Sequence, residues 1–221
     1  SRGLGDVYKR QYLGTESIVQ YGTSDQKERW LPKLASGEII STFALPESNS
    51  EPTEKNIKTI FSNGKINGKK IPVADGSYAD IAIVVVKNVD NNEITLAISE
   101  LTSNNISRKP ISTLDPSRDH AEIHFDNSEA EIMDTNNEGW GAVENIMNSA
   151  AVLMAFEQIG GAEASLNMAK NYALDRFAFG RQIGSYQAIK HKLADMYVKI
   201  ELAQSNSYYG AMMLNDGGAD L

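Results

Sequence analysis

The chain has 221 residues, and at about 150 residues per domain this length predicts more than one domain. Its 21 basic and 29 acidic residues leave a net charge of −8, which argues against a dedicated binder of nucleic acid or anionic membranes, because both need an excess of Lys and Arg. The absence of Cys excludes disulfides, thiol nucleophiles and cysteine-ligated metals.

The three histidines lack metal-site spacing, so no metal site is expected. No apolar run approaches the roughly 18 residues that span a bilayer, and no signal peptide is visible. A cytoplasmic protein with neither nucleic acid nor membrane as a partner fits these observations best.

The first residues do not resemble a natural start. The chain begins with Ser1, its first Met is Met133, and residues 1–11 are similar to translated adaptor sequence at the ends of library-derived reading frames. We therefore expect residues 1–11 to be a non-native or disordered tail.

Residues 12–51 read as helical and then apolar. Apolar residues recur at helical spacing behind potential cap residues at 24–27, and Gly37 stands where a C-terminal helix cap is expected. The apolar run 39–45 is consistent with a strand or a buried loop.

Residues 52–135 have the pattern of a small antiparallel β-domain. Asn63-Gly64 and Asn67-Gly68 are dipeptides typical of tight hairpins, because Asn and Gly tolerate a positive φ. Three strands are expected from β-branched runs and period-2 alternation, over residues 80–87, 93–99 and 121–126.

Residues 136–221 predict two long helices. The first runs from about Val143 to Asp175, and the helix cost of Gly160-Gly161 suggests close packing or a kink there. In the second helix, a seam at alternating spacings of four and three comprises Ile189, Leu193, Met196, Ile200, Ala203, Ser207, Gly210 and Leu214. Two such helices leave at least one apolar face uncovered, so a bundle needs more helices than these.

The corner between the two helices is the most informative stretch. Arg176 and Arg181 stand beside a turn, and Ser185 is positioned to cap the next helix. Arginines beside a helix N-terminus can hold a pyrophosphate, although ordinary loop charges are the commoner reading. No Walker loop, GxGxxG element or GxSxG nucleophile elbow is present.

Several motifs, in order along nearly the whole chain, resemble the acyl-CoA dehydrogenase family. They are Tyr21-Gly22 with residues 26–38, residues 43–48 where the family has Leu-Thr-Glu-Pro, Asn67-Gly68-Lys69-Lys70 with Ala79-Asp80, and residues 176–183 with Gln187 and 192–196. The pattern is most similar to a divergent bacterial branch that includes dehydrogenases for steroid and other bulky CoA thioesters.

The resemblance implies an α+β multidomain fold, truncated at both ends in this chain. Residues 12–51 would be the end of an N-terminal helical domain and residues 52–135 a small antiparallel β-barrel-like middle domain. Residues 136–221 would then form the first half of a C-terminal four-helix bundle.

The same resemblance implies FAD as the cofactor and α,β-dehydrogenation of an acyl-CoA thioester, in which a carboxylate removes the α-proton and hydride passes to the flavin. It also implies electron-transfer flavoprotein as a partner and a homotetramer or heterotetramer with FAD at subunit interfaces. The residues that it assigns to FAD are Phe43, Leu45, Pro46, Glu47, Ser48, Pro72, Val73, Ala74, Arg176, Phe179 and Gln187.

The chain departs from the family beside the flavin. Pro46 replaces the family's Thr, Ser48 replaces its Pro, and residues 72–74 replace an aromatic-Ile-Thr. Proline lacks an N–H and alanine a hydroxyl, so at least two potential donors to the flavin are lost, each worth about 1 kcal/mol net. Two alternatives therefore stay open: a flavin-poor, non-catalytic partner subunit, or acyl-CoA oxidase-like chemistry.

The sequence identifies no catalytic residue. In most family members the base lies far downstream of the position that matches Arg176, and in others it lies on the first long helix, where Ala150 stands here. Because alanine cannot abstract a proton, we expect the base beyond Leu221 and expect this chain alone to be inactive.

Overall fold

The computed structural model describes residues 7–115 and 118–215, without the side chains of residues 7–11. The chain forms two compact units, Ser1–Met147 and Asn148–Leu221. Residues 1–6 of the expected tail lie outside the described residues, whereas residues 7–11 belong to the first helix, α1 (Val7–Tyr21).

The first unit begins with a helical pair, α1 and α2 (Ser24–Ser36). Thr23 caps α2 through a reciprocal pair of hydrogen bonds with Gln26. The cap residue therefore lies one position before the cap residues expected at 24–27. The expected C-terminal cap is confirmed, because Gly37 has a φ of 71° and its N–H donates to the Leu34 carbonyl.

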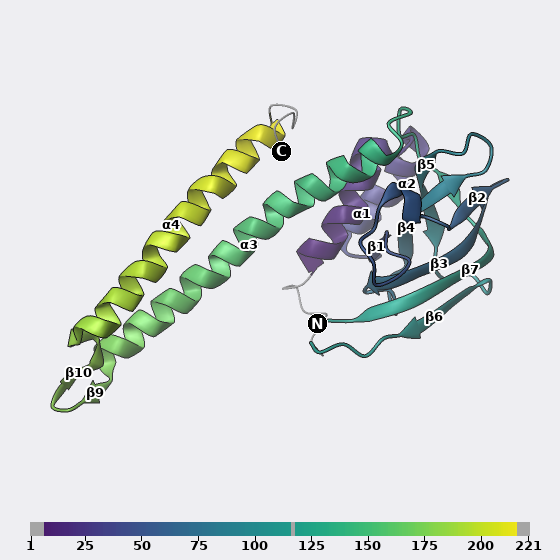
Figure 1. Cartoon of the computed structure of the whole chain (residues 1–221). Coiled ribbons are helices and arrows are strands. Elements are labelled where there is room, and N and C mark those ends of the chain that lie inside the picture. The colour runs from purple at the N-terminus through teal and green to yellow at the C-terminus, as the bar shows by residue number, and fades with distance from the viewer. Residues whose placement is uncertain (1–6, 116–117, 216–221) are drawn as a thin grey trace. The chain divides into compact units, whose positions relative to one another are not determined.

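A β half-barrel follows (Figure 1), with the strand order β6-β7-β3-β2-β4-β5-β8 and β1 paired to β4. A 3-10 helix, η1 (Glu54–Asn56), precedes β2. The strands are β1 (Ser41–Ala44), β2 (Ile60–Ser62), β3 (Lys65–Ala74), β4 (Ile81–Asn88), β5 (Ile94–Glu100), β6 (Ile106–Pro110), β7 (His120–Glu129) and β8 (Glu131–Ile132). The three expected strands are confirmed as β4, β5 and β7, and the open alternative at residues 39–45 is decided in favour of a strand.

The sequence predicted a purely antiparallel sheet, but the sheet contains both parallel and antiparallel strand pairs. One edge of β4 pairs with β5, while the other edge pairs in parallel with β1 and then with β2. Parallel neighbours need a crossover connection, and the β2–β3 hairpin lies between β1 and β4 in the chain and provides one. The remaining strand pairs of the sheet are antiparallel.

Strand β4 is buried on both faces, which explains its unbroken apolar sequence. Its odd-numbered residues pack with Ile18 of α1 and Trp30 of α2. Its even-numbered residues pack with Ile66 and Ile123 on the other side of the sheet. Because successive strand side chains point to opposite faces, a strand between two cores must be apolar at every position.

The two Asn-Gly dipeptides have different roles. Asn63 and Gly64, with φ values of 50° and 74°, form the expected turn between β2 and β3. The second expected hairpin is wrong, because Asn67-Gly68 lies inside β3, where the register with β7 shifts between Ile66 and Gly68. A Cβ on Gly68 would lie 2.6–2.8 Å from atoms of Thr59, so the glycine permits a close approach of the neighbouring chain.

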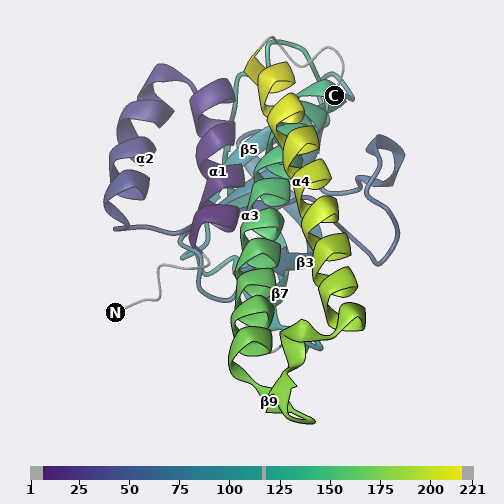
Figure 2. The same cartoon turned by 90° about the vertical axis from the view of Figure 1, so that its left-hand side faces the viewer.

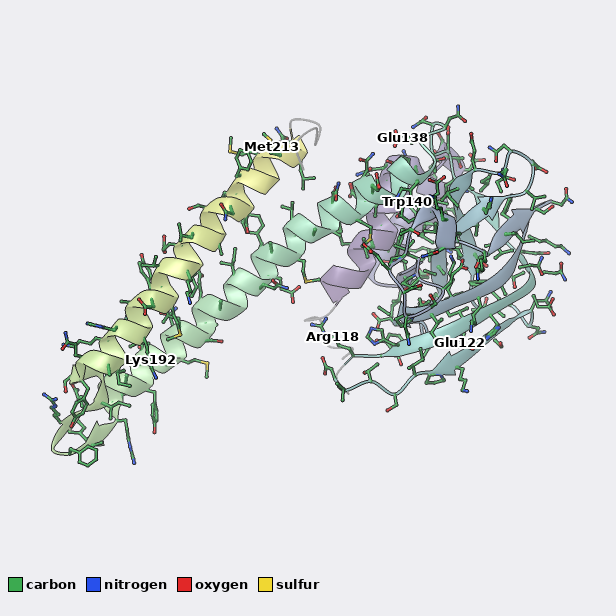
Figure 3. All side chains as sticks on the ribbon, viewed as in Figure 1. Arg118, Glu122, Glu138, Trp140, Lys192 and Met213 are labelled. Carbon is green, nitrogen blue, oxygen red and sulfur yellow. The ribbon has the colours of Figure 1, made fainter. Side chains whose placement is uncertain are left out.

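The first turns of α3 (Trp140–Asp175) are fastened to α1 within the first unit. The Tyr21 hydroxyl donates to Glu138 at 2.8 Å, and the Asn145 amide donates to both Tyr21 and Glu138, at 3.3 and 3.2 Å. Figure 3 labels Glu138 and Trp140 at this start of the helix. These hydrogen bonds hold the first turns of α3 beside the end of α1.

In the second unit, α3 and α4 (Gln187–Asn215) run side by side in opposite directions (Figures 1 and 2), as expected. The Phe156 and Tyr208 rings meet edge-on at 5.3 Å between centroids, and a Cβ on Gly210 would lie 3.3 Å from Val152. The segments between the helices are β9 (Phe177–Ala178), β10 (Arg181–Gln182) and the 3-10 helix η2 (Ile183–Ser185).

The packing seam expected on α4 is only partly covered. Ser207 is buried, whereas Met196 is 42% exposed. Large apolar side chains that are more than half exposed on the two helices include Met168, Tyr172, Leu202, Tyr209 and Met212, which confirms an uncovered apolar face. The close packing suggested for Gly160-Gly161 is not made within the described residues, where a Cβ on either glycine would meet no atom within 4 Å.

We expect Gly68→Ala to lower the free energy of unfolding of the first unit by about 2 kcal/mol or more. The φ of 148° is unfavourable for residues with a Cβ, and Thr59 would have to shift. Urea unfolding measures the change. The control is Gly141→Ala in the first turn of α3, within the first unit, where a Cβ would make only an ordinary contact at 3.9 Å from Glu138 and stability should not fall. Unchanged stability of Gly68→Ala would contradict the close approach of Thr59.

Candidate functional site

The structure brings together two of the segments that the sequence assigns to a cofactor, residues 43–48 and 72–74. The N–H of Ile71 donates to the Pro46 carbonyl at 2.7 Å, and the Thr42 hydroxyl donates to the Ala74 carbonyl at 2.6 Å. These bonds fasten the end of β1 and its following loop to the end of β3.

Only part of these segments reaches the surface. Three of these residues have side chains in the hydrophobic core: Phe43, Leu45 and Val73. Even the most accessible of them, Phe43, is only 9% exposed. The members that are half-buried or exposed are Pro46, Glu47, Ser48, Pro72 and Ala74. The accessible surface therefore combines two proline rings and an alanine with the polar groups of Glu47 and Ser48, a composition suited to a flat ring with polar edges.

A buried ion pair adjoins this surface. The Lys70 side chain is fully buried, and its Nζ donates to Glu47 Oε1 at 2.7 Å and to the Leu45 carbonyl at 3.2 Å. The Glu47 carboxylate also accepts from the backbone N–H groups of Lys58 and Thr59, at 2.8 and 3.0 Å. Glu47 was assigned to the cofactor, yet its carboxylate already has three donors from the protein.

Burial acts differently on the two charges of this pair. Desolvation lowers the pKa of Lys70 from 10.5 to about 8, although the Glu47 carboxylate acts in the opposite direction. Burial raises the pKa of Glu47, but the charge of Lys70 and the hydrogen bonds from Lys70 and Thr59 outweigh it and hold that pKa below the ordinary 4.5. Both groups are therefore charged at neutral pH.

Two backbone donors of the loop have no protein acceptor. Among residues 7–115 and 118–215, no described acceptor receives the N–H of Glu47 or of Ser48. Pro46 and Pro72 have no N–H, and Ala74 has no hydroxyl. A flavin bound here would depend on these two N–H groups and on the accessible carbons of Pro46, Pro72 and Ala74.

A polar pocket of about 330 Å³ adjoins the same loop. Its lining residues are Glu47, Ser48, Ser50, Asn56, Lys58, Thr59, Gly68 and Lys69. It shares Glu47 and Ser48 with the segments that the sequence assigns to FAD.

The remaining FAD residues of the sequence prediction belong to the second unit. Arg176 directly follows α3, Phe179 is 97% exposed at the tip of the β9–β10 hairpin, and Gln187 begins α4. No described acceptor binds the Arg176 guanidinium. The Arg181 guanidinium instead lies over the Tyr186 ring, 3.9 Å from its centroid.

Ser185 does not cap α4, and that expectation is wrong. Its hydroxyl donates to the Gln182 carbonyl at 2.6 Å, within the 3-10 helix η2. The extra 3-10 turn between β10 and α4 moves Ser185 away from the cap position.

No helix in the described part of the chain combines the length and apolarity needed to cross a membrane. The described residues also contain no cluster of three or more His, Cys, Asp or Glu side chains that could hold a metal ion.

We expect Glu47→Gln to lower the free energy of unfolding at pH 7 by roughly 1–3 kcal/mol, because it leaves the buried Lys70 ammonium without its counter-charge. The difference from wild type should shrink as the pH falls below about 4.5. The pKa of Glu47 is lower in the folded state than the ordinary 4.5. The stabilisation that the carboxylate provides is therefore fully present above about pH 4.5 and is lost when the folded carboxylate protonates.

Urea unfolding at neutral and acidic pH measures both effects. The control is Glu51→Gln, an exposed carboxylate on the same loop, which should show neither. A difference between Glu47→Gln and wild type that does not change with pH would contradict the ion pair.

Two family models match the chain. The model described as acyl-CoA dehydrogenase, N-terminal domain, matches residues 7–38, and the model described as acyl-CoA dehydrogenase, C-terminal domain, matches residues 137–220. A relative named acyl-CoA dehydrogenase from Bacillus subtilis (strain 168) is 32% identical over 217 residues, which cover 93% of this chain and 57% of the relative.

Two solved structures have the same fold. Butyryl-CoA dehydrogenase from Megasphaera elsdenii matches with a TM-score of 0.85 and 26% identity, over 95% of this chain and 58% of that one. A glutaryl-CoA dehydrogenase from Mycobacterium smegmatis in complex with FADH2 matches with a TM-score of 0.83 and 24% identity, over 96% of this chain and 57% of that one. The expected order of N-terminal helices, β half-barrel and long C-terminal helices is confirmed.

The chain spans 35–57% of the length of the curated relatives it matches. The matched regions lie at both ends of the described sequence, and the alignment with the Bacillus subtilis relative runs through the β-domain between them. By its motifs, its fold and these relatives, the chain belongs to the acyl-CoA dehydrogenase family.

Proposed function

We propose that the full-length protein that contains this chain catalyses FAD-dependent α,β-dehydrogenation of an acyl-CoA thioester and passes the electrons to electron-transfer flavoprotein. The observation that carries the proposal is that hydrogen bonds bring residues 43–48 beside residues 72–74 in a chain of this family. Electron-transfer flavoprotein and a cytoplasmic location are inferred from the family and the composition.

FAD would supply the hydride acceptor of the reaction. In this chain, the N–H groups of Glu47 and Ser48 would bind polar atoms of the flavin, while Pro46, Pro72 and Ala74 would exclude water from its ring. At the α3–α4 corner, the exposed Arg176 guanidinium would supply positive charge for the pyrophosphate, with Phe179 and Gln187 nearby in sequence.

A homotetramer or heterotetramer of the full-length chain is part of the proposal. The exposed apolar side chains of α3 and α4 support it, because large contiguous apolar surfaces are uncommon on isolated soluble proteins. These helices would contribute to packing in the whole protein that the chain does not provide by itself.

A second candidate function is a flavin-poor, non-catalytic partner subunit. The three positions that lack a donor, Pro46, Pro72 and Ala74, favour it, because each removes a potential hydrogen bond to the flavin. Such a subunit would retain the fold and the assembly surface without turning over substrate.

The test is to purify the full-length protein and record its visible absorption with a panel of CoA thioesters of short, long and steroid acyl groups. Enzyme function predicts a yellow protein whose flavin band is bleached by at least one thioester. A colourless protein that no thioester bleaches, and that gains activity only with a second dehydrogenase subunit, would favour the partner-subunit function instead.

We expect Arg176→Ala to weaken FAD binding by tenfold or more. A charge-assisted hydrogen bond contributes about 1.5–3 kcal/mol, and about 1.4 kcal/mol corresponds to a tenfold change in Kd. Fluorescence titration of the flavin-free protein measures the Kd. Lys170→Ala, which removes an exposed cation from α3, is the matched control and should leave the Kd within about twofold. An equal loss in both variants would indicate nonspecific attraction by charge.

A further inference from the structure

Two adjacent lysines on β3 have opposite environments. The Lys69 side chain is 44% exposed and pairs with Glu122 at 3.6 Å, and Figure 3 labels Glu122 on β7. The Lys70 side chain has no exposed surface. Enclosing an ammonium group is costly unless it is paired and hydrogen-bonded, and replacing a whole buried ion pair with apolar residues of similar volume often gives equal or greater stability. The position of Lys70 therefore points to a role other than packing.

Lys70 joins three segments of the chain. From β3, its Nζ reaches the Leu45 carbonyl and the Glu47 carboxylate, on either side of Pro46. The same carboxylate accepts the N–H groups of residues 58 and 59, just before β2. We call these contacts, which centre on Lys70 and Glu47, the Lys70 clamp.

The clamp holds the loop at consecutive residues. The Leu45 carbonyl binds Lys70, the Pro46 carbonyl accepts the Ile71 N–H, and the Glu47 side chain binds Lys70 again. With these acceptors occupied and the φ of Pro46 restricted by its ring, the loop has little freedom to turn its N–H groups toward an internal acceptor.

We propose that Lys70 is a positioning residue, whose ammonium holds residues 45–48 so that the N–H groups of Glu47 and Ser48 stay free for the flavin. The identity of that ligand rests on the proposed function, whereas the clamp itself does not. Prolines at 46 and 72 and alanine at 74 remove other donors, so binding depends more strongly on the two N–H groups and on their being ordered before the ligand arrives.

The first experiment is hydrogen exchange of the flavin-free full-length protein in two variants, Lys70→Met and Lys69→Met. Methionine keeps an unbranched side chain and removes the charge. Lys70→Met should accelerate exchange of the Lys58, Thr59 and Ile71 N–H groups by tenfold or more relative to the N–H groups of β4 and β5. Lys69→Met should leave this ratio unchanged.

The second experiment measures FAD affinity and the visible spectrum of bound FAD in the same proteins. Lys70→Met should raise the Kd for FAD by tenfold or more and shift the flavin bands toward those of free FAD, and Lys69→Met should do neither. A loss of global stability alone would not change the spectrum of the flavin that remains bound.

Uniformly faster exchange in Lys70→Met, in proportion to its lost stability, would overturn the proposal, as would unchanged FAD affinity. If Lys70→Met does not fold, Glu47→Gln replaces it. The N–H groups of Lys58, Thr59 and Ile71 should again exchange faster than those of β4 and β5, by a smaller factor. Uniformly faster exchange or an unchanged affinity for FAD would overturn the proposal in this variant too. A wild-type protein that binds no FAD would defeat the proposed function, while the exchange result would still decide whether the clamp orders the loop.

Discussion

The contact between Lys70 and Glu47 joins the chain segments from which the candidate site is built. Glu47 follows β1, Lys70 lies on β3, and the N–H groups that complete the carboxylate's partners precede β2. A fully buried ammonium cannot lose its carboxylate without a large cost, so the three segments are held in one arrangement. The surface formed by the loop and the end of β3 depends on this constraint.

The double burial of β4 provides the rigid support for that surface. One core lies between β4 and the helices α1 and α2, and the other lies on the opposite face of the sheet. Strand β1 is paired to β4 residue by residue from Ser41 to Ala44, which places the following loop at a defined position. A site whose contacts start directly after a fully buried strand needs only a short loop to be ordered, and the Lys70 clamp orders it.

The same loop departs from the sequence pattern of the family. Proline at 46 and at 72 removes two N–H groups, and alanine at 74 removes a hydroxyl. The N–H groups of Glu47 and Ser48, next to the lost ones, have no acceptor among the residues that the structure describes. The flavin-binding and flavin-poor alternatives therefore differ in whether two ordered backbone donors suffice where the family has more.

Local signals in the sequence predicted most of the elements, whereas the site needed tertiary contacts. The cap at Gly37, the turn at Asn63-Gly64 and the apolar run of β4 depend on neighbouring residues in the chain, so the sequence determined them, together with the family. Asn67-Gly68 has the same local chemistry as a hairpin turn, yet in the structure it continues β3, where Gly68 lies against Thr59 and the register with β7 shifts. Ile66 and Lys70 are both buried and lie four residues apart, so they share one face of β3, and the tertiary structure decided that this face points inward and that Lys70 meets Glu47 there.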